Sequence, residues 1–259
     1  MSDAFFEPLG DGRFASTVHA TGPWSAQSQH LGPPSALLVR AMEQLPAAAP
    51  MLFARVTVEI LGPVPVAEVA VTAGVDRPGR AVELLSAELS AGGRTVARAR
   101  AWRHIRSDTS AVAVGVDEPL ASPESGDVMY RPDSWGPGYL DAMEWRTLMG
   151  HLGKPGPATV WARQGVALVA GEAPTGLQRL FVVADSGNGV SSRMDPHEWL
   201  FINSELTVHL YREPASDWIG LDATTAIGPD GVGTAFSVLH DLQGAVGRGA
   251  QALVVRPQR

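Results

Sequence analysis

Cysteine is absent from the 259 residues of this chain. Disulfide frameworks, thiolate metal sites and cysteine nucleophiles are therefore excluded. Lysine is almost absent as well, because Lys154 is the single example and the other cationic side chains are arginines. The formal net charge of -7 argues against a general nucleic-acid binder, which needs a basic surface to neutralise phosphates.

Long apolar runs are also missing. No stretch approaches the roughly 20 uninterrupted apolar residues that a membrane span requires. Residues 1–7 lack the basic and apolar regions of a secretory signal. The hydrophobic fraction of 45% is that of a folded globular protein. We therefore expect a cytoplasmic location and no membrane or nucleic-acid partner.

The first half of the chain combines one helix pattern with several strand patterns. Residues 33–43 open with two prolines and then contain no helix breaker, which predicts a largely buried helix starting near Pro34. The Val- and Ile-rich runs around this helix alternate with polar residues and end at glycine or proline, which is typical of strands. The predicted strands span residues 12–19, 53–61, 66–75, 82–91 and 95–104.

The second half repeats this order after a segment rich in Ser, Asp, Glu, Pro and Gly. A second proline-led helix is predicted from Pro174 to about Val190. The strands predicted around it span residues 142–149, 157–168, 200–211, 218–225, 233–241 and 246–255. The offset of roughly 150 residues suits a duplicated domain. We therefore expect units at residues 1–106 and 136–259, joined by a linker at 107–135.

A helix followed by an antiparallel sheet in each half makes the fold class α+β. A helix that is apolar over most of its surface must be wrapped by its sheet, as in the hotdog arrangement. Two such units can join their sheets edge to edge and so hide exposed edge strands. The expected fold is a double hotdog.

Several motifs, spread over nearly the whole chain apart from the linker, carry a family resemblance. They are Gly22-Pro23-Trp24, Gln29 to Leu38, Gly171 to Arg179, Ala184 to Gly189, Phe201 to Arg212 and Gly249-Ala250-Gln251. Together they resemble the acyl-CoA thioesterase II-like (TesB-like) family, particularly its actinobacterial branch. The resemblance implies hydrolysis of acyl-CoA thioesters to the free acid and CoA. CoA is then part of the substrate, no retained cofactor is implied, and a homodimer of double hotdogs is expected.

The resemblance also implies catalytic residues. Family members use an Asp, a Thr or Ser, and a Gln from the C-terminal unit to hold and activate water. The matching positions here are Glu205, Thr225 (less closely Thr224) and Gln251. Glu205 extends the carboxylate by one methylene relative to Asp, and Leu31 replaces the first glycine of the family's turn before the first helix.

Other polar residues are further candidates. Asp185 and Asn188 lie one helical turn apart, so Asp185 is a rival nucleophile or base, or else a structural carboxylate. The start of either helix, at Gly176 or Gly32, could supply N–H donors for an oxyanion. His30 is interpreted either as a ligand contact or as a turn residue with a structural hydrogen bond. No metal site is expected.

Two alternative functions remain open at this point. A degenerate hotdog protein could bind acyl-CoA without turnover, as the changes at Glu205 and Leu31 would allow. A hydratase-like hotdog would need an Asp and a His after a helix, for which Asp195 and His197 are the available pair. A serine hydrolase is disfavoured because the Gly-x-Ser-x-Gly elbow is absent. Arginines at the rim of the binding groove are expected to meet the CoA phosphates.

Overall fold

The computed structural model describes residues 3–133, 135–150, 154–195 and 198–258. In the N-terminal half, two strands and a small hairpin precede the helix α1, Gly32–Glu43, and four long strands follow it. Pro33 and Pro34 occupy the first turn of α1, where a missing N–H removes no hydrogen bond. The strands of this half are β1 Ala4–Gly10, β2 Arg13–Ser16, β3 Thr21–Gly22, β4 Ser25–Gln29, β5 Met51–Ile60, β6 Glu68–Arg77, β7 Val82–Ala91 and β8 Arg94–Ile105.

The C-terminal half repeats this plan with a divided helix. The helix α2, Gly176–Ala184, is followed by the short helix α3, Gly187–Val190, with two residues between them. Thr175 and Gln178 cap the start of α2 reciprocally. The strands of this half are β9 Asp127–Met129, β10 Met143–Met149, β11 Ala158–Gln164, β12 Ala167–Val169, β13 Trp199–Asn203, β14 Glu205–Leu210, β15 Trp218–Ile227, β16 Val232–Asp241 and β17 Gly244–Pro257.

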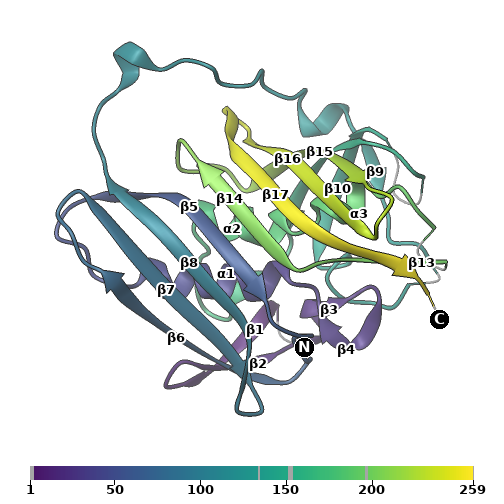
Figure 1. The fold of residues 1–259 in the computed structure, drawn as a ribbon, viewed down its shortest axis with the longest axis horizontal. Helices are drawn as coiled ribbons and strands as arrows, with labels where there is room; N and C mark the ends of the chain where they lie inside the picture. Colours follow the sequence, from purple (N-terminus) through teal and green to yellow (C-terminus); the bar gives the residue numbers. More distant parts are fainter. Residues whose placement is uncertain (1–2, 134, 151–153, 196–197, 259) are drawn as a thin grey trace.

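One continuous sheet joins the two halves (Figure 1). Within the described residues its order is β12-β1-β2-β6-β7-β8-β5-β14-β17-β16-β15-β11-β10-β9, with β13 also paired to β17. The halves meet where β5 and β14 pair in antiparallel fashion, with Thr57 opposite Thr207. The two hydroxyls of this pair lie 3.1 Å apart. Equivalent positions in the two halves therefore differ by 150 residues, and a local two-fold axis passes through this pair.

The two helices pack side by side against the sheet. They run antiparallel, so the start of α1 lies beside the end of α2. They approach each other tightly at Gly32, where a Cβ would lie only 2.1 Å from the carbonyl oxygen of Val182. Leu37, Leu38, Leu180 and Phe181 are fully buried in the core that both helices share. Glycine at position 32 is thus required for the two helix ends to meet.

The structure refines three features of the predicted elements. The strand expected at residues 12–19 is β2, which ends at Ser16, and the strand β1 before it was not predicted. The second helix is broken at Asp185 and Ser186 rather than running on to Val190. The segment expected to be a linker contains β9, which pairs with β10 and so extends the C-terminal half of the sheet.

Candidate active site

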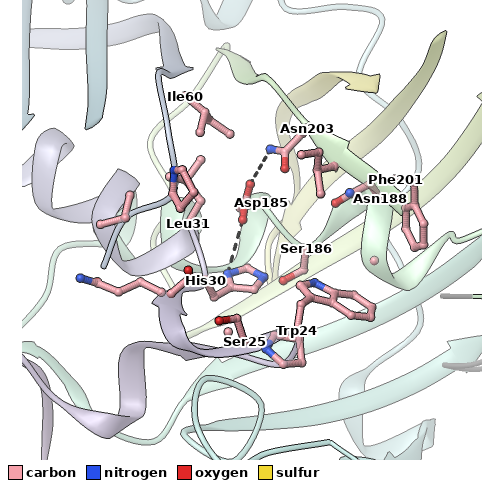
Figure 2. Close-up of a pocket in the computed structure, with 18 of the residues that line it drawn as sticks. Trp24, Ser25, His30, Leu31, Ile60, Asp185, Ser186, Asn188, Phe201 and Asn203 are labelled. Atoms are coloured by element: carbon pink, nitrogen blue, oxygen red, sulfur yellow. Dashed lines mark hydrogen bonds and ion pairs between the residues drawn. The ribbon is translucent and has the colours of Figure 1, made fainter. Parts of the chain in front are cut away.

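A cavity of about 410 Å³ opens between the two halves, at the start of α1 and the end of α2 (Figure 2). The β3–β4 hairpin, the end of β5, the connecting segment between β8 and β10, α3 and β13 all contribute to its lining. Most of the lining side chains are apolar, including Trp24, Leu31, Ile60, Trp145 and Phe201. Polar groups are concentrated around one carboxylate, that of Asp185.

Asp185 follows the last residue of α2 and is only 5% exposed. Asn203 Nδ2 donates a hydrogen bond of 2.8 Å to its Oδ1. A carboxylate at the C-terminal end of a helix faces the negative end of the helix dipole, so this position does not stabilise α2. Asp185 is thus a buried acid at a helix C-terminus that borders the cavity.

Gln251 lies on β17 and approaches the same carboxylate oxygen as Asn203. Its Nε2 donates to the backbone oxygen of Asp185 at 3.0 Å and lies 3.4 Å from Asp185 Oδ1. Its Oε1 accepts the backbone N–H of Asn188 at 2.9 Å. A Cβ at Gly187 would approach this Oε1 to 3.0 Å, so a larger residue there would crowd the amide. Both ends of the Gln251 amide are therefore held in one orientation.

His30 enters the same site from the N-terminal half. Its ring stacks on the ring of Tyr139, with centroids 3.8 Å apart and planes within 6°. Its Nδ1 accepts the backbone N–H of Gly32 at 3.1 Å and lies 3.4 Å from Asp185 Oδ2. Burial lowers the pKa of His30, although the charge of Asp185 acts in the opposite direction. Because Nδ1 is an acceptor, the neutral ring carries its proton on Nε2.

Tyr139 supports this arrangement from behind. Its hydroxyl donates to the carbonyl oxygen of Val182 at 2.8 Å and lies 3.0 Å from Ser186 Oγ. Burial raises the pKa of Tyr139, so the phenol stays protonated. The side chain thus ties the connecting segment to the end of α2 and gives the His30 ring a flat surface.

Thr225 shares a sheet face with Gln251 but does not reach the carboxylate. The register places Thr225 opposite Ala235, and Ala235 opposite Gln251. The Thr225 hydroxyl lies 2.7 Å from Ser191 Oγ, which in turn donates to the carbonyl oxygen of Gly187. Thr225 therefore braces α3 against β15, and it is not among the residues that line the cavity.

Glu205 lies on the opposite face of the sheet. Its neighbours Leu206 and Val208 point into the core, so the alternation of β14 turns Glu205 outward. Its carboxylate accepts the backbone N–H of Ala252 and the hydroxyl of Thr207, both at 2.8 Å. The N–H of Ala252 lies where the pairing of β17 passes from β14 to β13. The expected convergence of Glu205, Thr225 and Gln251 on one water is therefore not found, and the carboxylate beside Gln251 is Asp185.

The structure also departs from the expectation for the two proposed oxyanion donors, Gly176 and Gly32. Gly176 begins α2, at the opposite end of that helix from Asp185, and a Cβ there would lie 1.9 Å from the carbonyl oxygen of Pro214. Its role in the structure is close packing, away from the site. Gly32 does lie at the site, but its N–H is bonded to His30. The amide of Asn188 fixes Gln251 through its backbone, while its side chain lines the cavity.

Asn203 is the functional candidate that the sequence did not reveal. Asparagine is depleted in strands, so its place inside the predicted strand at residues 200–211 was the available signal. His197 lies outside the described residues, which leaves the hydratase-like pair untested. Among the described residues no cluster of three His, Asp or Glu side chains could hold a metal ion. No described helix is long and apolar enough to cross a membrane.

Each half of the chain matches a domain of a known protein family. Residues 123–255 match the acyl-CoA thioesterase C-terminal domain, and residues 20–104 match the acyl-CoA thioesterase N-terminal domain. No curated protein matches the sequence.

Solved structures resemble the fold over almost the full length. A hot dog fold protein of unknown function from Alicyclobacillus acidocaldarius superimposes with a TM-score of 0.75 at 15% identity, over 97% of this chain and 96% of that chain. A tesB protein from Mycobacterium avium subs paratuberculosis gives 0.70 at 16%, over 97% and 96%. An acyl-CoA thioesterase II from Mycobacterium marinum gives 0.65 at 12%, over 98% and 95%. The predicted α+β double hotdog is confirmed.

Proposed function

This chain belongs to the acyl-CoA thioesterase family, and from this premise we propose that it hydrolyses an acyl-CoA thioester at Asp185. The observation that carries the proposal is the buried Asp185 carboxylate, which is held by Asn203 and lies beside Gln251 inside an apolar cavity. The family resemblance implies an Asp, a Thr or Ser hydroxyl and a Gln, and in this proposal the amide of Asn203 takes the place of the hydroxyl. Here they come from the end of α2, from β13 and from β17.

The proposed reaction requires a base and a fixed water. Asn203 and Gln251 both approach Asp185 Oδ1, and Oδ2, which lies 3.4 Å from His30 Nδ1, is the oxygen that takes a proton from water in this proposal. The water oxygen attacks the thioester carbonyl carbon, and the tetrahedral intermediate then expels the CoA thiolate as the C–S bond breaks. The thiolate receives the proton from Asp185, so the products are the free acid and CoA.

The oxyanion of the intermediate needs a hydrogen-bond donor. His30 is placed to supply one, because a neutral ring with Nδ1 bonded to Gly32 carries a proton on Nε2. No hydrogen bond within the described part of the chain uses His30 Nε2. In this role the N-terminal half would contribute a hydrogen-bond donor to a site whose carboxylate and amides come from the C-terminal half.

The cavity suits the acyl and thioester portion of the substrate. Its described lining contains no arginine or lysine, so the CoA phosphates would lie outside it. Binding without turnover is the competing hypothesis, and it drew part of its support from the Glu at position 205. That glutamate is turned away from the cavity, and the carboxylate at the site is an unaltered aspartate.

The test compares two carboxylates. Asp185→Asn should lower the kcat for CoA release about 1,000-fold, the middle of the range for loss of a general base. Glu205→Gln, the matched control, should stay within about threefold of the wild type, because Glu205 lies on the other face of the sheet. Unchanged CoA release by Asp185→Asn, or wild-type binding of acyl-CoA without any release of CoA, would contradict the proposal.

A further inference from the structure

Tyr139 contacts both halves of the site from a segment that belongs to neither helix. It lies in the connecting segment, just before β10, and only 1% of it is exposed. Its backbone N–H donates to the carbonyl oxygen of Thr21 at 2.9 Å, which holds the residue against β3. Its ring packs on His30, and its hydroxyl reaches the end of α2. One side chain therefore touches both His30 and the helix end that precedes Asp185.

The direction of the His30 ring depends on two separate contacts, because the ring torsion of a histidine is otherwise broad. Its Nδ1 accepts the N–H of Gly32, and this hydrogen bond selects one of two ring orientations related by a half turn. The bond acts at a single atom, so it leaves the ring free to tilt. The stack on Tyr139, with centroids 3.8 Å apart and planes within 6°, fixes the plane of the ring. Together the two contacts give Nε2 one direction.

A tilted ring would bring a different chemistry to the site. His30 Nδ1 lies 3.4 Å from Asp185 Oδ2 (Figure 2). If the bond to Gly32 is lost, Nδ1 can carry the proton and donate it to this oxygen. That tautomer has no proton on Nε2, and it occupies the oxygen that takes a proton from water in the proposed reaction. The bond to Gly32 and the stack together prevent both losses.

The hydroxyl of Tyr139 has a separate, structural task. The carbonyl oxygen of Val182 is one of the last four of α2, which lack the usual partner within a helix. The Tyr139 hydroxyl donates to this oxygen at 2.8 Å and lies 3.0 Å from Ser186 Oγ. Neither contact involves His30. The ring and the hydroxyl of Tyr139 can therefore be tested separately.

We propose that Tyr139 is a positioning residue of this site, whose ring keeps the proton of His30 on Nε2, available to the oxyanion of the thioester intermediate. The inference rests on the proposed hydrolysis and adds to it a residue of the connecting segment. Tyr139 does not touch the reacting atoms, and its effect on the rate passes through His30.

The first experiment measures kcat and KM for CoA release from octanoyl-CoA in two variants of Tyr139. Leucine offers no flat surface, so Tyr139→Leu should lower kcat about tenfold, the upper end of what the loss of one aromatic pair explains, and leave KM within about threefold. Tyr139→Phe retains the ring and should keep kcat within about threefold, although loss of the hydroxyl lowers its melting temperature. Equal losses of kcat in the two variants would contradict the assignment to the ring.

A double variant shows whether the effect passes through His30. In the His30→Gln background, Tyr139→Leu should change kcat by less than about twofold, because the ring that Tyr139 positions is gone. A general disturbance of the fold would instead lower kcat by the same factor in both backgrounds. Equal factors would therefore overturn the proposal.

A nitrogen-15 spectrum of the imidazoles, recorded above the pKa of histidine, tests the positioning without an assay of hydrolysis. His30→Gln identifies the His30 signals among those of the seven histidines. The wild type and Tyr139→Phe should carry the His30 proton on Nε2 alone, whereas Tyr139→Leu should show both tautomers. If the wild type releases no CoA, the proposed hydrolysis fails and this spectrum still decides whether Tyr139 positions His30. A proton on Nε2 alone in Tyr139→Leu would overturn that role.

Discussion

The two ends of the helix pair offer a direct comparison, because the local two-fold axis relates them. The Asp185 cavity, of about 410 Å³, lies at the start of α1 and the end of α2. A second cavity of about 400 Å³, here called the Glu43 cavity, lies at the end of α1 and the start of α2. The repeat of the fold has thus produced two spaces of nearly equal size.

The chemistry of these two spaces differs. An offset of 150 residues relates Asn203, which lines the Asp185 cavity, to Phe53, which lines the Glu43 cavity, and it relates Gln251, which contacts Asp185, to Ala101. Glu43 itself accepts hydrogen bonds from Thr175 and Gln178, the residues that cap α2. Both carboxylates border a cavity, but that of Glu43 accepts hydrogen bonds from the cap of α2, whereas that of Asp185 is held by Asn203 and approached by Gln251. Duplication preserved the architecture, and catalysis is proposed at one end only.

After the loss of Asp185 itself, the largest effect is expected at positions that the axis relates, one in each cavity. Asn203→Leu should lower kcat for CoA release about 100-fold or more, because Asp185 Oδ1 loses its 2.8 Å donor. Phe53→Leu, the equivalent position at the other end, should stay within about threefold of the wild type and change mainly stability. Steady-state kinetics on one acyl-CoA checks both, and equal losses of rate would remove the proposed asymmetry.

The next largest effect is expected at His30, through which the N-terminal half would contribute to catalysis. His30→Gln should lower kcat about tenfold, since an amide N–H replaces the ring donor less well, with a smaller change in KM. Burial lowers the pKa of His30, so the folded protein disfavours its protonation. The wild type should lose stability as the pH falls below the ordinary value of 6.5, and His30→Gln should lose less. The kcat of both proteins and their melting temperatures, measured from pH 5 to 8, check the two effects. Melting temperatures that depend on pH identically in the wild type and in His30→Gln would contradict the prediction for stability.

The smallest effect is expected at Glu43, and it concerns stability. Burial raises the pKa of Glu43, so the folded state binds its proton more tightly than the unfolded state does. Stability from this group is therefore lost as the pH rises from the ordinary value of 4.5 through the raised pKa. The melting temperature of Glu43→Gln minus that of the wild type should be on the order of 1–3 °C larger at pH 7 than at pH 4. A difference in melting temperature that does not change with pH would contradict this account.

Much of the fold could be predicted from the sequence because its signals are local. Proline pairs marked the start of α1, and alternating Val and Ile runs marked the long strands. The break between α2 and α3 was not predicted, because Asp185 and Ser186 are both compatible with a continuing helix. That break places the Asp185 carboxylate at the cavity.

The site was harder to predict because it depends on which face of the sheet each strand residue points to. In β14 the alternation of Leu206, Val208 and Leu210 already implies that Glu205 points outward. By the same alternation Asn203 would also point outward, yet it reaches Asp185. The irregularity between β13 and β14 reverses the facing of the side chains. Only the register against β17 reveals this reversal.

The central claim is that one end of a duplicated fold carries the chemistry, and the most direct measurement compares the two carboxylates that the helix ends present. CoA release from octanoyl-CoA should fall about 1,000-fold in Asp185→Asn and stay within about threefold of the wild type in Glu43→Gln. Near-normal release by Asp185→Asn, or a comparable loss in Glu43→Gln, would contradict the claim.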